Sequence, residues 1–174
     1  TRPNLILLTI DALSEHVFSQ EDIQKLRTIS FLKKNGVYFS NMHAASTDEF
    51  LAYQGMLTGI LPSKNILEYN KSIEKVPYTQ GEWFQQREYA TGAFLSSDLL
   101  HKSSGIHAGF STYDDDFSWM RGWSVGIWGR LVPLKNSIRS SSQSTDLLLD
   151  WMEQQQHPFM AWLQFSEPQA PYRP

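Results

Sequence analysis

The chain has 174 residues, of which 41% are hydrophobic and 19% charged, a balance typical of one globular domain. Its net charge of -3 argues against nucleic-acid binding, for which a strongly basic face is usual. The absence of cysteine excludes disulfides, thiolate metal ligands and a nucleophile derived from cysteine. No uninterrupted apolar stretch approaches the roughly 20 residues that a membrane-spanning helix needs.

The first part of the chain predicts a strand followed by a helix. Asn4–Ile10 is an almost continuous apolar run ending at Asp11, as expected of a strand that is buried on both faces. Such a strand places its last polar residue at the carboxyl edge of a parallel sheet, where the sites of α/β proteins lie. Apolar residues recur every three positions over Ile23–Leu32, which predicts an amphipathic helix that stops at Gly36. Val37–Ser40 predicts either a short strand or an extended entry to the following loop.

The middle of the chain predicts two helices and a strand. Glu49–Leu57 is expected to be a helix, and three residues before it are candidate N-caps: Ser46, Thr47 and Asp48. Leu61–Pro77 is polar and irregular. Gly81–Tyr89 predicts a weak helix, and Thr91–Leu95 an apolar strand.

The last part predicts a loop, a helix and a strand. The serine-rich run Ser140–Ser144 is interpreted as a loop that leads into a helix over Thr145–Gln156. Apolar residues share one face of that helix, and Pro158 follows it. Phe159–Phe165 is a strongly apolar strand. Because strands alternate with helices, the fold class is α/β, with a mostly parallel sheet flanked by helices.

Several segments, in order, resemble the sulfatase branch of the alkaline-phosphatase superfamily. They are NLILLTID (Asn4–Asp11), NGVYFSNMHAASTDEFLAYQGMLTG (Asn35–Gly59), ATGAFLSSDLL followed by GFSTYDDDF, and STDLLLDWMEQQQHPFMAWLQFSEPQAPYRP at the end. The resemblance implies that residues 1–174 are the N-terminal portion of one sulfatase-like α/β domain, incomplete at its C-terminal end. It also implies a site built from a nucleophile, an arginine, a histidine and a metal ion held by carboxylates.

The residues at the implied site positions differ from that pattern. Counting back without a gap from Leu57-Thr58-Gly59, the family frame puts Glu49 at the nucleophile and Tyr53 at the arginine. Gln169 stands where the family has a histidine in its D-P-H motif. Two further positions differ, with Glu167 at the aspartate of that motif and Gln164 where relatives often have histidine. Asp11 matches a metal-binding aspartate, but Ala12 follows where many sulfatases have a second one.

These differences lead to the hypothesis that the domain has lost catalysis and serves as a binding or assembly component. The alternative is a metal-dependent hydrolase of sulfate or phosphate esters, or a transferase of envelope groups, with a rearranged site. No cofactor is expected, and a divalent cation such as calcium is expected only if residues beyond Pro174 complete its site. The expected partners are the remainder of the domain beyond Pro174, another protein chain or a membrane surface. The resemblance implies an extracytoplasmic location, periplasmic or membrane-associated.

Simpler interpretations remain open for the individual residues. Asp11 could cap the turn after its strand, and Glu49 could be an ordinary first-turn residue favoured by the helix dipole. The acidic run Asp114–Asp116 invites a calcium interpretation, but consecutive acids cannot all face one ion, so a solvated loop is predicted. The five histidines show no metal-binding spacing.

Residues 118–140 form an aromatic and basic segment that the resemblance does not explain. Tryptophan mixed with arginine is enriched at protein interfaces and suits a membrane headgroup boundary. The candidate contact residues are Trp119, Arg121, Trp123, Trp128 and Arg130, with Lys135 and Arg139 adding positive charge. The competing interpretation is that the tryptophans fold back and cover the sheet.

Overall fold

The computed structural model describes residues 2–18, 21, 25–62, 78–117, 123–125, 131–133 and 139–168, with backbone alone at 18, 123–125 and 131–133. The chain divides into two compact units, one formed by Thr1–Asp11 and Ala45–Pro174, the other by Ala12–Ala44. The larger unit holds the sheet and every residue of the candidate site described below.

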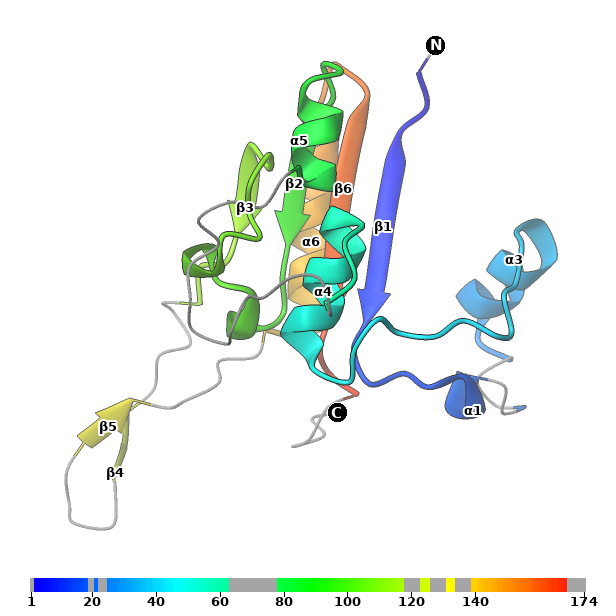
Figure 1. Cartoon of the computed structure of the whole chain (residues 1–174), viewed down its shortest axis with the longest axis horizontal. Coiled ribbons are helices and arrows are strands. Elements are labelled where there is room, and N and C mark those ends of the chain that lie inside the picture. Colours follow the sequence, from blue (N-terminus) through cyan, green and yellow to red (C-terminus); the bar gives the residue numbers. More distant parts are fainter. Residues whose placement is uncertain are drawn as a thin grey trace. The chain divides into compact units, whose positions relative to one another are not determined.

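The larger unit is built on a four-stranded parallel sheet with the order β1-β6-β2-β3 (Figure 1). Its strands are β1 (Leu5–Ile10), β2 (Ala90–Phe94), β3 (Thr112–Asp114) and β6 (Phe159–Phe165). Its helices are α4 (Glu49–Thr58), α5 (Gln80–Gln85) and α6 (Ser141–Glu153), with 3-10 turns at Asp98–Leu100 and Lys102–Ser104. A two-stranded antiparallel pair joins β4 (Trp123–Val125) to β5 (Leu131–Pro133). The predicted parallel α/β architecture is confirmed.

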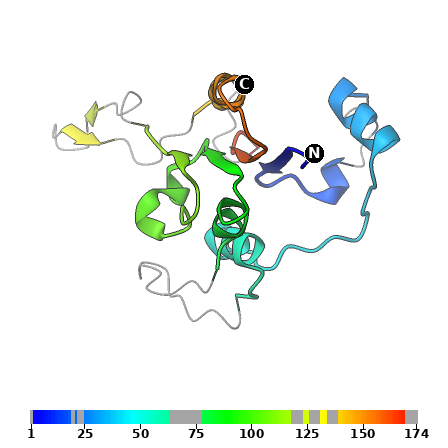
Figure 2. The same cartoon turned by 90° about the horizontal axis from the view of Figure 1, so that it is seen from above.

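Helices cover the two faces of the sheet in separate layers, α4 and α5 on one side and α6 on the other (Figure 2). Alternation along β6 explains this division, because successive side chains of a strand point to opposite faces. Met160 and Trp162 join the core cluster beneath α4, while Phe159, Ala161 and Leu163 pack in a second cluster with Leu148 of α6.

The strand β1 lies at one edge of the sheet formed by the described strands. Its side chains Leu5, Ile6 and Leu8 are 40%, 49% and 43% exposed. Leu7 packs against the core cluster beneath α4, whereas Ile6 and Leu8 lie on the opposite face of β1 and are exposed, so in the described part of the chain the prediction of a strand buried on both faces is wrong.

Side-chain caps determine where the helices begin. Asp48 is the N-cap of α4 and accepts a hydrogen bond from Leu51 N at 2.9 Å, so it is the residue that acts among the three candidates. Thr79 and Glu82 form a capping box on α5, which is shorter than the predicted Gly81–Tyr89 helix. Ser140 and Gln143 form another on α6, so Ser141–Ser144 is helical and the predicted loop is wrong.

The smaller unit contains α1 (Glu15–Phe18) and α3 (Arg27–Asn35). The helix α3 confirms the second half of the predicted amphipathic helix and ends at Gly36, whose backbone N–H bonds Leu32 O at 2.8 Å. Ile23 lies outside the described residues. Of the two alternatives for Val37–Ser40, the strand is wrong, since the segment pairs with no described strand, and the irregular backbone agrees with an entry to the following loop.

Candidate functional site

The candidate site centres on Asp11, which follows β1 directly at the carboxyl edge of the sheet. Its side chain is buried, and its backbone N–H continues the strand ladder by bonding Phe165 O at 2.9 Å. The next residue, Ala12, has φ 55. This left-handed conformation is unfavourable for alanine and ends the extended backbone of β1. The ladder bond to Phe165 places Asp11 at the end of β1.

Tyr53 reaches this carboxylate from α4. Its hydroxyl donates a hydrogen bond to Asp11 Oδ1 and lies 3.2 Å from Thr9 Oγ1. The ring is buried against Trp162, with centroids 5.3 Å apart, and Trp162 Nε1 donates to Thr9 Oγ1 at 3.1 Å. Burial first, and then the charge of Asp11, raises the pKa of Tyr53, so this hydroxyl is a neutral donor at ordinary pH.

Gln164 and Ser166 supply the other donors to Asp11. The amide of Gln164, on β6, donates to Asp11 Oδ2, and the Ser166 hydroxyl lies 3.1 Å from the same oxygen. The orientation of Gln164 is determined from its other end, because Gln164 Oε1 accepts from Ser96 N at 2.8 Å. The three side chains that donate to Asp11 are all neutral. Tyr53 comes from α4, Gln164 from β6, and Ser166 from the position just after β6.

The described residues around Asp11 do not by themselves supply the ligands of a divalent cation of the kind that the family resemblance implies. Calcium takes six to eight oxygen ligands, and magnesium takes an octahedral set that usually includes one or two carboxylates and several waters. Asp11 is one carboxylate, Ala12 offers no side-chain ligand, and the three side chains that donate to Asp11 are neutral. Within the described ranges, no group of three His, Cys, Asp or Glu side chains is placed to hold a metal ion.

Glu49 lies in the first turn of α4, next to the cap Asp48, and its side chain is partly buried. This placement agrees with the first-turn interpretation, since an acidic side chain is favoured at the N-terminus of a helix. Tyr53 follows one turn later, at the position where the family frame has arginine. The structure thus brings Tyr53 and Asp11 into direct contact. The side chain that contacts Asp11 from position 53 is a neutral phenol and not a basic group.

Glu167 has a structural contact that the sequence analysis missed. Its carboxylate accepts from the backbone N–H and the hydroxyl of Ser141, the first residue of α6. A carboxylate at a helix N-terminus is stabilised by the unpaired N–H groups there. The sequence carries only part of this signal. The serine-rich start of α6 can be recognised as a helix cap, but no local pattern predicts that Glu167, 26 positions later, contacts it.

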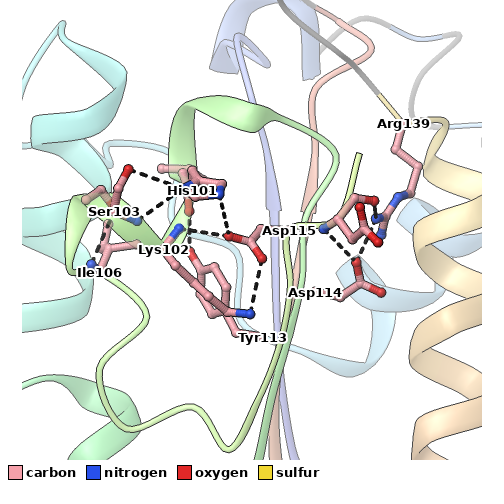
Figure 3. A network of polar contacts seen from close by, with 11 residues as sticks. His101, Lys102, Ser103, Ile106, Tyr113, Asp114, Asp115 and Arg139 are labelled. Atoms are coloured by element: carbon pink, nitrogen blue, oxygen red, sulfur yellow. Dashed lines mark hydrogen bonds and ion pairs between the residues drawn. The ribbon is translucent and has the colours of Figure 1, made fainter. Parts of the chain in front are cut away.

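A second polar cluster surrounds the acidic run that begins at the last residue of β3 (Figure 3). Asp115 accepts from Lys102 N at 2.8 Å, and its carboxylate lies 3.3 Å from Lys102 Nζ and 3.6 Å from His101 Nε2. Asp114 ends β3 and pairs with the Arg139 guanidinium at 2.7 Å. The predicted solvated loop is wrong for these two aspartates, since each is held by a basic partner and the Asp115 side chain is only 8% exposed.

Arg139 belongs to this cluster and not to an exposed contact surface. It is 2% exposed, lies over the Phe117 ring at 5.0 Å, and donates to Asp116 O at 2.8 Å. Trp119, Arg121, Trp128, Arg130 and Gln169 lie outside the described residues, and Trp123 is described only as backbone of β4. Their predicted roles stay predictions.

Comparison with known proteins identifies related families and structures. A family model described as Sulfatase matches residues 3–174. No curated protein sequence matches the chain. The fold is similar to that of a phosphonate monoester hydrolase of Agrobacterium radiobacter, with a TM-score of 0.70 and 16% identity over 98% of this chain and 42% of that one.

Two further solved structures share the fold. An alkaline phosphatase superfamily protein from Vibrio parahaemolyticus has a TM-score of 0.63 and 17% identity, over 99% of this chain and 42% of that one. The putative sulfatase yidJ from Bacteroides fragilis has a TM-score of 0.62 and 12% identity, over 98% of this chain and 45% of that one. The chain therefore spans less than half the length of the three structures, and the likeness establishes the fold alone.

Proposed function

The chain belongs to the sulfatase family, and from that premise we propose that this domain has lost ester hydrolysis and serves as a binding or assembly component. The observation that carries the proposal is the set of partners of Asp11. Tyr53, Gln164 and Ser166 satisfy its carboxylate with neutral donors, so its charge is accommodated by the protein itself.

The chemistry of ester cleavage supports the same proposal. A sulfate or phosphate ester is anionic, and its cleavage needs positive charge or strong donors around the oxygens where charge develops. Glu49 at the nucleophile position would meet that ester with a negative charge, and Tyr53 offers no compensating positive one. The raised pKa of Tyr53 also disfavours its ionisation, so the phenol is a poor candidate for a replacement nucleophile.

Assays of the full-length protein with 4-nitrophenyl sulfate and 4-nitrophenyl phosphate test the loss of catalysis. We expect no turnover above the buffer rate with calcium, magnesium or manganese present, because losing even one transition-state donor costs roughly a hundredfold or more in rate. Steady turnover that Glu49→Gln abolishes, and that the control Glu21→Gln at an 87% exposed side chain leaves intact, would instead establish the hydrolase with a rearranged site.

The cellular setting of this role is proposed from the family resemblance alone, as extracytoplasmic, either periplasmic or membrane-associated. In the parts of the chain that the structure describes, no helix combines the length and apolar character needed to cross a membrane. Fractionation of cells that produce the full-length protein checks the location, and recovery only in the cytosolic fraction contradicts it.

A further inference from the structure

A pocket of about 520 Å³ lies at the end of the sheet opposite to Asp11. It is lined by the start of β1 and by the last turn of α5 with the residues after it, including Arg2, Leu5, Trp83, Phe84, Arg87 and Tyr89. Leu5 and Asp11 are six positions apart along an extended strand, which corresponds to about 20 Å. This pocket is therefore distinct from the candidate site, and its volume is in the range of sites that bind ligands.

Aromatic side chains form the wall of the pocket. Trp83 meets Phe84 edge-on at 4.9 Å between centroids, and Phe84 meets Tyr89 at 5.1 Å. Phe84 and Tyr89 also pack against the main core cluster, which holds this wall in place. Trp83 and Leu5 are 42% and 40% exposed, so the mouth of the pocket presents apolar surface to solvent.

The two arginines of the pocket differ in their partners. Arg2 donates to Arg87 O and lies 3.4 Å from the Glu88 carboxylate, so its charge is partly compensated. The Arg87 guanidinium stacks 3.6 Å from the centre of the Trp83 ring and donates to Trp83 O at 3.0 Å. Among the described residues, Arg87 forms no ion pair with an acidic side chain. The pocket thus offers apolar walls and one uncompensated, oriented cation.

A second pocket of about 460 Å³ adjoins the first through Arg2 and is lined by Glu88, His157 and Pro158. In this second pocket Glu88 lies 3.4 Å from Arg2, so Arg87 is the cation that remains for a ligand. The positive charge of Arg87 and the apolar walls are complementary to a peptide in which a carboxylate stands next to a hydrophobic side chain.

We propose that these pockets bind an acidic-hydrophobic peptide segment of a partner protein. The apolar side chain of that segment enters beside Trp83, Leu5 and Phe84, and the neighbouring carboxylate accepts hydrogen bonds from Arg87. This inference rests on the proposed binding function and identifies the surface and the partner chemistry through which that function operates.

Fluorescence anisotropy with the full-length protein and three labelled hexapeptides tests the proposal. The first peptide alternates leucine with aspartate, the second replaces aspartate by lysine, and the third replaces leucine by serine. We expect saturable binding of the first peptide only, because each control removes one half of the complementarity. A charge-assisted contact corresponds to roughly a tenfold change in Kd, so Arg87→Ala should weaken binding about tenfold.

Variants separate the pocket from general effects. Trp83→Ala should also weaken binding, while Arg27→Ala, which removes an exposed arginine of the other unit, should not. Arg87→Lys keeps the charge but loses the planar donor, so it should fall between the wild type and Arg87→Ala. Circular dichroism and urea unfolding confirm that each variant is folded.

The outcomes are distinct from those of the hydrolysis assay. Equal binding of all three peptides, binding insensitive to Arg87→Ala and Trp83→Ala, or no binding at all would overturn the pocket proposal whatever the turnover. Binding of free 1-naphthoate without any peptide would assign the pocket to a small aromatic acid instead. Ester turnover together with selective peptide binding would overturn the loss of catalysis and leave the pocket assignment standing.

Discussion

The hydroxyl of Tyr53, in the first half of α4, donates a hydrogen bond to the carboxylate of Asp11, 42 positions earlier at the end of β1. The family resemblance implies an arginine at position 53 and a metal-binding aspartate at position 11. In this chain Tyr53 and Asp11 form one buried contact that also includes Gln164 and Ser166. The positions that the resemblance assigns to catalysis and metal binding here form hydrogen bonds that connect α4 to the end of β1 and to β6.

Replacing Tyr53 by phenylalanine removes this contact with little change in shape. We expect the free energy of unfolding to fall by about 1–3 kcal/mol, because a buried carboxylate oxygen loses one donor and cannot recover it from water. Urea unfolding of the full-length protein measures the change. Tyr38→Phe is the matched control, since Tyr38 also donates to a carboxylate, that of Glu15 at 3.0 Å, but is 41% exposed. Equal losses in the two variants would contradict a special role for the buried pair.

The stability of the protein should decline in alkaline solution. Burial and the nearby charge of Asp11 raise the pKa of Tyr53 above the ordinary value of 10.0, and burial with the charge of Asp115 does the same for Tyr113. Below that value both tyrosines are protonated in the folded and unfolded states, and their contribution to stability is fully present. Above it the unfolded chain loses these protons while the folded chain keeps them, so the free energy of unfolding falls as pH rises.

Unfolding experiments between about pH 9 and pH 11 measure this dependence. Each such tyrosine contributes a slope of about 1.4 kcal/mol per pH unit once the unfolded form is ionised. Tyr53→Phe should therefore make the decline shallower by about that slope, and Tyr113→Phe should do the same. A decline that neither substitution alters would mean that other groups control alkaline unfolding.

We expect that divalent cations do not stabilise the folded protein by binding at Asp11. The neutral donors around this carboxylate leave one charged ligand, which does not by itself complete a calcium or magnesium site. Melting temperatures in EDTA and in millimolar calcium, magnesium or manganese should agree within error for wild type and for Asp11→Asn. A rise in Tm with one of these ions that Asp11→Asn abolishes would show that the site is completed as a metal centre, and would favour the hydrolase alternative.

The Arg139–Asp114 pair should contribute to stability and not to partner binding. Arg139→Leu removes the partner of Asp114 and is expected to cost about 3 kcal/mol, the lower end for a broken buried pair, because the Asp114 side chain is still 23% exposed. Urea unfolding measures this cost. The double variant Arg139→Leu with Asp114→Asn should recover part of the loss, since no unpaired charge remains. If Arg139→Leu left the stability unchanged but weakened association with a partner chain or membrane, Arg139 would instead belong to the predicted contact surface of residues 118–140.

Local patterns were sufficient to predict much of the framework from sequence. The apolar runs at β2 and β6, the capped helix at α4 and the alternation of strands with helices all depend on neighbours within a few residues. Hydrophobic periodicity and side-chain caps act over that same range, so these elements can be recognised before any fold is known. The family motifs likewise placed Asp11 and Tyr53 at one site, and the structure brings them into contact.

Only the tertiary structure decided what those residues do there. Gln164, Ser166 and Tyr53 surround Asp11 because β6 lies beside β1 and α4 lies over both, a convergence of positions as much as 155 residues apart. The burial of Arg139, the Glu167 contact with α6 and the exposure of β1 at the sheet edge depend on distant partners in the same way. Sequence patterns report the preferences of a segment and its near neighbours, whereas the partner of a buried charge is set by which segments the packed sheet and helices bring together.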